Sequence, residues 1–142
     1  MGIKDANNMG AAMAPAFADT LITHFQDTGR NPSYYDVIAS GDLGYIGKDI
    51  AIDIAKSKGY NIKSNYDDCG VLIFDKNAQD THSGGSGCAC CGTVFSGYFF
   101  KQLREKKIKK ILLIATGALM NSTSSQQGES IPGIAHAISI EL

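Results

Sequence analysis

The chemically most suggestive segment is the ten-residue run 82–91, His-Ser-Gly-Gly-Ser-Gly-Cys-Ala-Cys-Cys. Gly84, Gly85 and Gly87 permit positive φ angles and a close approach of the backbone to a bound group. A helix is expected to begin directly after this turn, and a helix start offers amide donors and the positive end of the macrodipole. His82 adds a side-chain donor beside it. Together these features favour an anionic guest such as a carboxylate, a phosphate or a thioester oxygen.

Each of these residues also has a purely structural interpretation. The glycines could serve only to pack a helix start closely against a sheet. Ser86 could cap the helix through its hydroxyl, which is the common role of serine in that position. Asp42 could cap the second helix, and its carboxylate would repel a dianionic ligand unless a calcium ion lay between them.

The four cysteines do not follow the spacing of a metal site. Zinc sites usually combine two ligand pairs, whereas Cys88, Cys90 and Cys91 crowd into one helix start and Cys69 stands apart. Small buried thiols are therefore expected, with no metal. The glycine turn also lacks the third glycine of a dinucleotide loop and the Gly-Lys-Ser/Thr of a P-loop, which argues against a nucleotide.

Composition indicates one globular domain that spans residues 1–142. The chain is 44% hydrophobic and 19% charged, with a formal net charge of -1, so it gives no general electrostatic reason to bind nucleic acid. The basic run 101–110 is interpreted as the solvated end of a helix. No apolar stretch reaches the roughly 18 to 20 residues that a bilayer requires, and no signal peptide is evident, so we expect a soluble, cytoplasmic chain.

Hydrophobic periodicity predicts a layered α/β fold whose sheet is mixed but mostly parallel, with helices on both faces. A short connection before the last strand predicts that this strand runs antiparallel. Pro15 is expected in the first turn of its helix. The apolar faces expected are Ile46, Ile50 and Ile54 in the second helix, and Cys91, Phe95 and Tyr98 in the third. The expected elements are helices at 12–29, 46–58 and after 90, strands at 35–40, 109–115 and 134–140, and a strand or buried lid at 69–74.

Two loops are placed where α/β proteins usually bind ligands, at the carboxyl ends of strands. Residues 41–44, Gly-Asp-Leu-Gly, follow the first strand, and residues 116–118, Thr-Gly-Ala, follow the central one. Asp42 and Gly117 therefore join the glycine turn as candidate binding residues.

Five ordered motifs resemble the stage V sporulation protein AD family of the thiolase-like superfamily. They lie at 7–15, 40–44, 68–70, 82–90 and 115–119, and the resemblance covers essentially the whole chain. It implies a longer protein of two similar halves, of which this chain is the carboxyl-terminal part. The missing amino-terminal half would leave sheet edges to be covered, so we expect the isolated chain to form a homo-oligomer.

The resemblance also implies a function. The family's role is to bind dipicolinic acid (pyridine-2,6-dicarboxylate) and to help its uptake into the developing spore with other stage V sporulation membrane proteins. This implies dipicolinate, with or without calcium, as the ligand, no further cofactor, and a peripheral location at the inner spore membrane.

An enzymatic role is the alternative implied by the wider superfamily. Thiolases and ketoacyl synthases use a nucleophilic cysteine in the first half and a histidine plus a histidine or asparagine in the second. The second-half positions fall at 41–44 and 83–86, where neither residue type occurs. A non-catalytic binding module is therefore predicted. A thiolase- or ketoacyl-synthase-type acyltransferase, active or degenerate, is the alternative, and a docking domain for other sporulation proteins is a third reading.

Overall fold

The computed structural model describes residues 2–81, 83–84 and 87–142. Its sheet has the strand order β2-β1-β3-β4, in which β1 pairs in parallel with β2 and β3, and β4 is antiparallel to β3. The mixed, mostly parallel α/β fold predicted from the sequence is thus confirmed, whereas its relation to the thiolase-like superfamily stays a prediction. The elements are α1 (Met9–Thr28), β1 (Val37–Ser40), α2 (Gly44–Ser57), β2 (Tyr66–Asp68), α3 (Cys69–Ile73), α4 (Cys90–Val94), α5 (Phe100–Arg104), β3 (Lys110–Ala118), α6 (Ser122–Gln126) and β4 (Gly133–Glu141).

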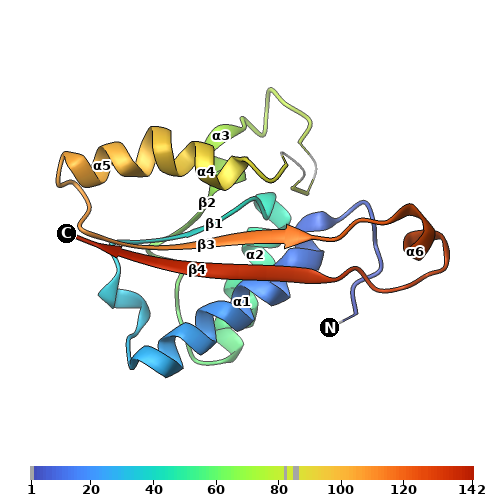
Figure 1. Ribbon diagram of the computed structural model, residues 1–142, viewed down its shortest axis with the longest axis horizontal. Helices are drawn as coiled ribbons and strands as arrows, with labels where there is room; N and C mark the ends of the chain where they lie inside the picture. The colour runs from blue at the N-terminus through green and yellow to red at the C-terminus, as the bar shows by residue number, and fades with distance from the viewer. Residues whose placement is uncertain (1, 82, 85–86) are drawn as a thin grey trace.

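Helices cover both faces of this sheet (Figure 1). On one face lie α1 and α2, which enclose a core that contains Phe17, Leu21 and Ile38. On the other face lie α3, α4 and α5, which enclose a second core around Cys69, Phe99 and Ile111. The carboxyl ends of β1 and β3 therefore lie between the two sets of helices.

Helix α1 begins earlier than expected. Asn8 caps it by accepting a hydrogen bond from the Ala11 amide (3.0 Å), and Pro15 lies inside the helix. The expectation that proline must sit in the first turn is wrong, because the helix accommodates one carbonyl without its usual amide partner. The expected end at Gly29 is confirmed, since Gly29 adopts a left-handed conformation with φ of 66°.

The buried face of α2 is also different from the expected one. Ile46 is 48% exposed, and the buried residues are small ones such as Gly47, Ala51 and Ala55. A Cβ atom at Gly47 would lie 2.7 Å from the carbonyl oxygen of Gly10 in α1, so the two helices approach at backbone distance. Close packing through small residues replaces the isoleucine face that periodicity predicted.

One continuous helical stretch contains α4, a π-helical turn (Phe95–Phe99) and α5. The π turn holds one extra residue, so the buried side chains are Cys90, Val94, Phe99 and Leu103, spaced by four, five and four positions. Tyr98 is consequently half exposed, and its expected place on the buried face is wrong.

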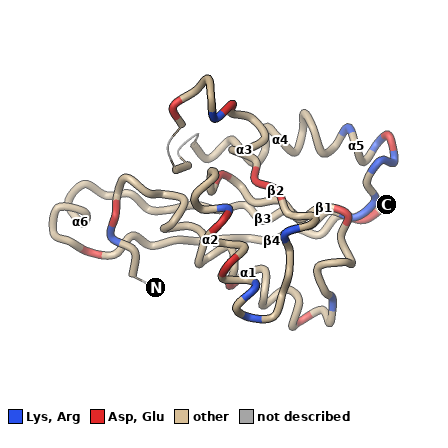
Figure 2. The backbone as a smooth tube through the Cα atoms, turned by 180° about the vertical axis from the view of Figure 1, so that it is seen from behind, with Lys and Arg blue, Asp and Glu red and all other residues tan. Residues whose placement is uncertain are grey.

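Residues 69–73 differ from the predicted structure, whereas the basic run 101–110 agrees with it. Residues 69–73 form the helix α3, where a strand or lid was expected, because the Asp68 side chain caps a helix start directly after β2. The basic run after Lys101 is exposed at the end of α5, as predicted, and Figure 2 shows the cations gathered there.

Candidate functional site

The candidate site lies at the carboxyl ends of β1 and β3. Ser40 ends β1 and pairs with Ile114 of β3, so the loop 41–43 that follows β1 lies next to the last residues of β3. A Cβ atom at Gly41 would lie 2.9 Å from the Thr116 hydroxyl. Glycine at this position therefore leaves the space that the threonine side chain uses.

A buried carboxylate fixes the loop between β1 and α2. The Asp68 side chain at the end of β2 accepts hydrogen bonds from the amides of Leu43 (2.8 Å) and Gly44 (3.1 Å) and from the Ser40 hydroxyl (2.5 Å). It also accepts bonds from two amides in the first turn of α3, at 3.0 and 3.2 Å. Burial raises the pKa of Asp68 above its usual range, and these hydrogen bonds oppose that shift.

The start of α1 holds the glycine segment against this loop. The Gly10 amide donates to the carbonyl of Ser83 (2.9 Å), and the Ser83 hydroxyl donates to the Asn8 side chain. Gly84 has a φ of 80°, and its amide nitrogen would lie 2.7 Å from a Cβ atom placed at Gly44. A Cβ atom at Gly84 itself would lie 2.9 Å from the Asp42 carbonyl oxygen, so both positive φ and close packing require glycine there, and the structural interpretation of the glycines applies to Gly84.

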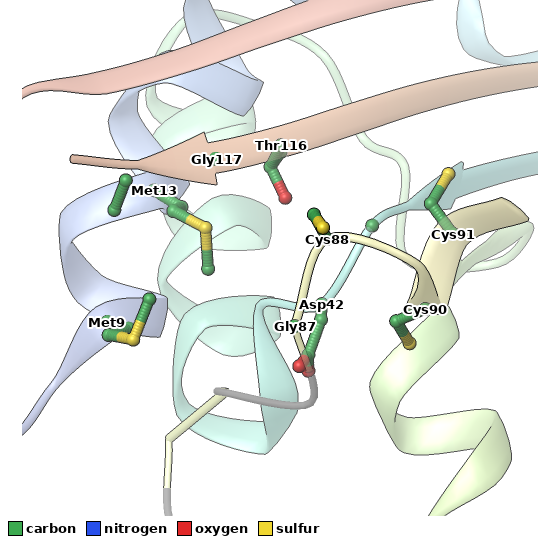
Figure 3. A pocket seen from close by; sticks show the side chains of 11 residues that line it. Met9, Met13, Asp42, Gly87, Cys88, Cys90, Cys91, Thr116 and Gly117 are labelled. Atoms are coloured by element: carbon green, nitrogen blue, oxygen red, sulfur yellow. The ribbon is translucent and has the colours of Figure 1, made fainter. Parts of the chain in front are cut away.

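A pocket of about 140 Å³ opens at this point (Figure 3). Methionine side chains of α1 lie on one side and cysteine side chains at the start of α4 on the other, with the Thr116 hydroxyl directed into the space between them. Its described lining residues are Met9, Met13, Gly41, Asp42, Gly87, Cys88, Cys90, Cys91, Thr116, Gly117 and Ala118.

The Thr116 hydroxyl is the most informative polar atom of this pocket. Its oxygen is buried, and the described residues provide no hydrogen-bond partner for it. A buried hydroxyl without a partner costs about 1–3 kcal/mol, so such groups are uncommon in folded proteins unless a ligand or water satisfies them. The atom is thus placed to donate a hydrogen bond to a guest.

The charge of the described pocket lining is negative. Asp42 is 8% exposed and contributes a carboxylate, and none of the described lining residues is a lysine or an arginine. The described part of the chain holds no group of three His, Cys, Asp or Glu side chains placed to bind a metal. A guest with two negative charges would therefore need compensation from a cation or from groups outside this lining.

Comparison with known proteins decides the family. The family described as stage V sporulation protein AD matches residues 1–141 of this chain. The chain is also 48% identical over 141 residues to "Stage V sporulation protein AD" of Bacillus subtilis (strain 168). It belongs to the stage V sporulation protein AD family. This agrees with the five motifs and supports a role in sporulation.

The alignment covers very different shares of the two proteins. The alignment includes 99% of this chain but 41% of the Bacillus subtilis protein, so the chain spans about two fifths of its relative's length. No helix in the part of the chain that the structure describes has the length and apolar character needed to cross a membrane.

The structure brings together three of the site residues that the sequence of this chain predicted. Asp42, Gly87 and Gly117 line the pocket, and Gly87 has the positive φ (91°) expected of the turn. Gly84 is not among the described lining residues and packs against Gly44. His82, Gly85 and Ser86 were also predicted to face a ligand, and they lie outside the described residues.

Two expected roles differ from what the structure shows. Helix α2 has Leu43 as its N-cap without a side-chain cap, so the suggested capping by Asp42 is wrong; the Asp68 carboxylate accepts the first amides instead. Helix α4 begins with Ala89 as its N-cap, and the Cys90 amide donates to the carbonyl of Gly87 (3.3 Å). At least one amide expected to meet a ligand is therefore engaged within the chain.

Sequence reasoning did not place the methionines or cysteines at the pocket. The predicted helix 12–29 places Met13 near its start and leaves Met9 outside it. Because α1 begins at Met9, both methionines lie in the first turns of the helix, and both line the pocket. The sequence contained one signal for the pocket lining: Thr116 directly follows the apolar part of β3, at the strand end where ligands usually bind.

Proposed function

We propose that this chain is the carboxyl-terminal part of a longer sporulation protein, and that its pocket forms part of a non-catalytic binding site for dipicolinic acid. The protein would help to bring this acid into the developing spore. Family membership supports the sporulation role. The buried Thr116 hydroxyl without a partner carries the assignment of the ligand site to this pocket.

The aromatic ring of dipicolinate suits the size and the apolar lining of the pocket. The cavity of about 140 Å³ is close to the size of an apolar cavity, about 150 Å³, that takes up benzene. Met9, Met13 and Ala118 offer apolar contacts to a ring, and Thr116 offers a donor to a carboxylate oxygen. The open side of the pocket leaves further contacts to the remainder of the longer protein.

The charge of Asp42 favours the calcium chelate over free dipicolinate. Free dipicolinate is a dianion, and the buried carboxylate would repel it. The calcium chelate is neutral, and Ca²⁺ readily accepts a carboxylate oxygen among its six to eight ligands. Asp42 would then bind the complex through the metal, which requires no cation in the pocket lining.

Titration calorimetry of Thr116→Val tests the site. Valine keeps the side-chain shape and removes the hydroxyl, so binding of calcium dipicolinate should weaken about 10-fold or more, the effect of one charge-assisted hydrogen bond. Folding stability should stay equal or rise, because an orphaned donor is removed. Thr123→Val on exposed α6 is the matched control. Unchanged affinity of Thr116→Val in the protein extended to its relative's length would refute this site.

Asp42→Asn separates the two forms of the ligand. The neutral amide should strengthen binding of free dipicolinate and weaken binding of the calcium chelate. The opposite pattern would show that Asp42 does not face the metal. Covalent acylation of a cysteine with release of free coenzyme A from an acyl-CoA would instead support the acyltransferase alternative.

The partner that completes the site is proposed to be the amino-terminal half of the longer protein. An apolar groove of about 370 Å³ lies between α3 and the π-helical turn, and its rim includes Leu72, Ile73 and Tyr98, which are 37%, 43% and 50% exposed. Such a patch favours a protein partner. When that half is absent, we expect a second copy of this chain to occupy the groove, so that the isolated chain forms a homo-oligomer.

Analytical ultracentrifugation tests this face. The chain alone should self-associate, and the separately produced amino-terminal half should replace the self-contact. Tyr98→Ser should weaken both associations, whereas Asp49→Ser on exposed α2 should not. Purely monomeric behaviour with no complex would contradict the proposal.

We also propose that other stage V sporulation membrane proteins hold the assembled protein peripherally at the inner spore membrane, which co-fractionation with spore membranes would test.

A further inference from the structure

Two cysteines from different helices belong to the same buried cluster, and one of them, Cys91, also lines the pocket. Cys69 is the first residue of α3, and Cys91 is the second residue of α4. Cys69 is fully buried, and Cys91 packs against the same apolar core. Because Cys91 packs against the cluster that contains Cys69, the two thiols are close enough to interact directly, and each alters the acidity of the other.

The two thiols differ in access and in acidity. Cys91 is half-buried and lines the pocket, whereas Cys69 has no exposed surface. The interaction with Cys69 lowers the pKa of Cys91, and the same interaction together with burial raises the pKa of Cys69. A small reagent in the pocket would therefore meet Cys91 first, in the more readily ionised form.

We propose that Cys91 and Cys69 form a redox-active thiol pair, in which Cys91 reacts with a low-molecular-weight disulfide and Cys69 resolves the product. The Cys91 thiolate attacks one sulfur of the small disulfide, whose S–S bond breaks and releases one small thiolate. The Cys69 thiol then gives its proton to solvent, attacks the Cys91 sulfur and displaces the second small thiolate. Two cysteine thiols are oxidised, and one small disulfide is reduced to two thiols.

The cross-link would act directly on the pocket. A Cys69–Cys91 disulfide closes the chain segment between them, which carries Gly87 and Cys88 of the pocket lining. It also withdraws the Cys91 thiol from that lining. Oxidation should therefore restrict the segment that forms one side of the pocket, since a cross-link reduces the freedom of the loop it closes.

Peptide mapping under non-reducing conditions tests the pair. Trypsin cuts after Lys63, Lys76 and Lys101, so Cys69 lies in peptide 64–76 and the other three cysteines lie in peptide 77–101. The native 142-residue chain is incubated with oxidised glutathione, its remaining thiols are alkylated, and the digest is analysed by mass spectrometry. We expect two of the four cysteine thiols to be lost and the two peptides to be joined by one disulfide.

Matched cysteine variants identify the partners. Cys91→Ser should abolish the joined peptides, whereas Cys88→Ser and Cys90→Ser should retain them. Cys69→Ser should stop at one glutathione adduct on Cys91, because the resolving thiol is gone. Circular dichroism of each variant verifies that it is folded.

Three results would overturn the proposal. They are joined peptides that persist in Cys91→Ser, a disulfide confined to peptide 77–101, and native protein that keeps all four thiols while urea-unfolded protein is oxidised. None of these measurements involves dipicolinate, so the outcome does not depend on the proposed ligand.

Discussion

Replacement of Asp68 tests how the pocket loop is held in place. Its two carboxylate oxygens divide the work: Oδ1 accepts the amides of Gly44, Gly70 and Val71, and Oδ2 accepts the Leu43 amide and the Ser40 hydroxyl. Asparagine keeps one oxygen and places an NH₂ group at the other position. Alanine keeps neither oxygen.

The expected losses follow from this division. In Asp68→Asn the oxygen can retain the three Oδ1 partners, and the Ser40 hydroxyl can turn to accept from the new NH₂ group while Tyr66 donates to it (2.8 Å). The Leu43 amide is orphaned and the Ser40 hydroxyl proton loses its acceptor, and the orphaned amide alone costs about 1–3 kcal/mol. Asp68→Ala leaves four buried amides without an acceptor, so we expect a loss of about 4 kcal/mol or more at roughly 1 kcal/mol for each.

Urea unfolding monitored by circular dichroism measures these losses as changes in the free energy of unfolding. Asp67→Asn is the matched control, because Asp67 is part-exposed and its ion pair with Lys48 (2.7 Å) should contribute less than about 1 kcal/mol. Equal stability of Asp68→Asn and the wild type, or equal losses for asparagine and alanine, would refute the division of roles between the two oxygens.

Three further predictions concern packing and pH. Gly10→Ala should destabilise the fold strongly, because its Cβ atom would lie 2.1 Å from the Leu43 carbonyl oxygen; a melting temperature equal to that of the wild type would contradict this packing. Gly92→Ala, in a helix and without neighbours within 4 Å, should instead stabilise by about 0.5–1 kcal/mol in urea unfolding, and a loss would contradict it. Burial and the nearby Arg30 lower the pKa of His24 from 6.5, because both disfavour the charged imidazolium in the folded protein. The contribution of His24 to the free energy of unfolding is therefore fully present above that pH and is lost as the pH falls. His24→Gln should therefore flatten the decline in unfolding free energy between about pH 7 and about pH 5, and an unchanged slope would contradict this assignment.

Much of the fold was predictable because local patterns and tertiary packing agree. The continuous apolar run of β3 indicated a central strand, and Ile111, Leu112 and Ile114 are fully buried between β1 and β4. Gly29 indicated the end of α1 because a left-handed residue there favours glycine. Periodicity and turn chemistry were sufficient at these positions.

The remaining differences arise where tertiary contacts override local preference. Helix α1 extends to Met9 because Asn8 caps it and the Gly10 amide meets Ser83, a partner far away in the sequence. The extra residue of the π turn shifts every later side chain of that helix, so Tyr98 faces outward. Spacing rules that assume 3.6 residues per turn do not detect such an insertion.

The candidate site was predictable only in its location. Strand-end positions indicated Asp42 and Gly117, since the carboxyl edge of a parallel sheet collects its loops. The orphaned hydroxyl of Thr116 depends on the space left by Gly41, and the contact of Cys69 with Cys91 depends on how α3 meets α4. Neither relation is visible in the linear sequence.

Methionine-methyl NMR during titration with calcium dipicolinate tests the proposed pocket most directly. The chain contains four methionines; Met9 and Met13 line the pocket, whereas Met120 lies outside its described lining and is 40% exposed. Binding in the pocket of the protein extended to its relative's length should shift the Met9 and Met13 signals saturably and leave Met120 in place. Saturable binding without any shift of Met9 and Met13 would place the ligand elsewhere and contradict the account.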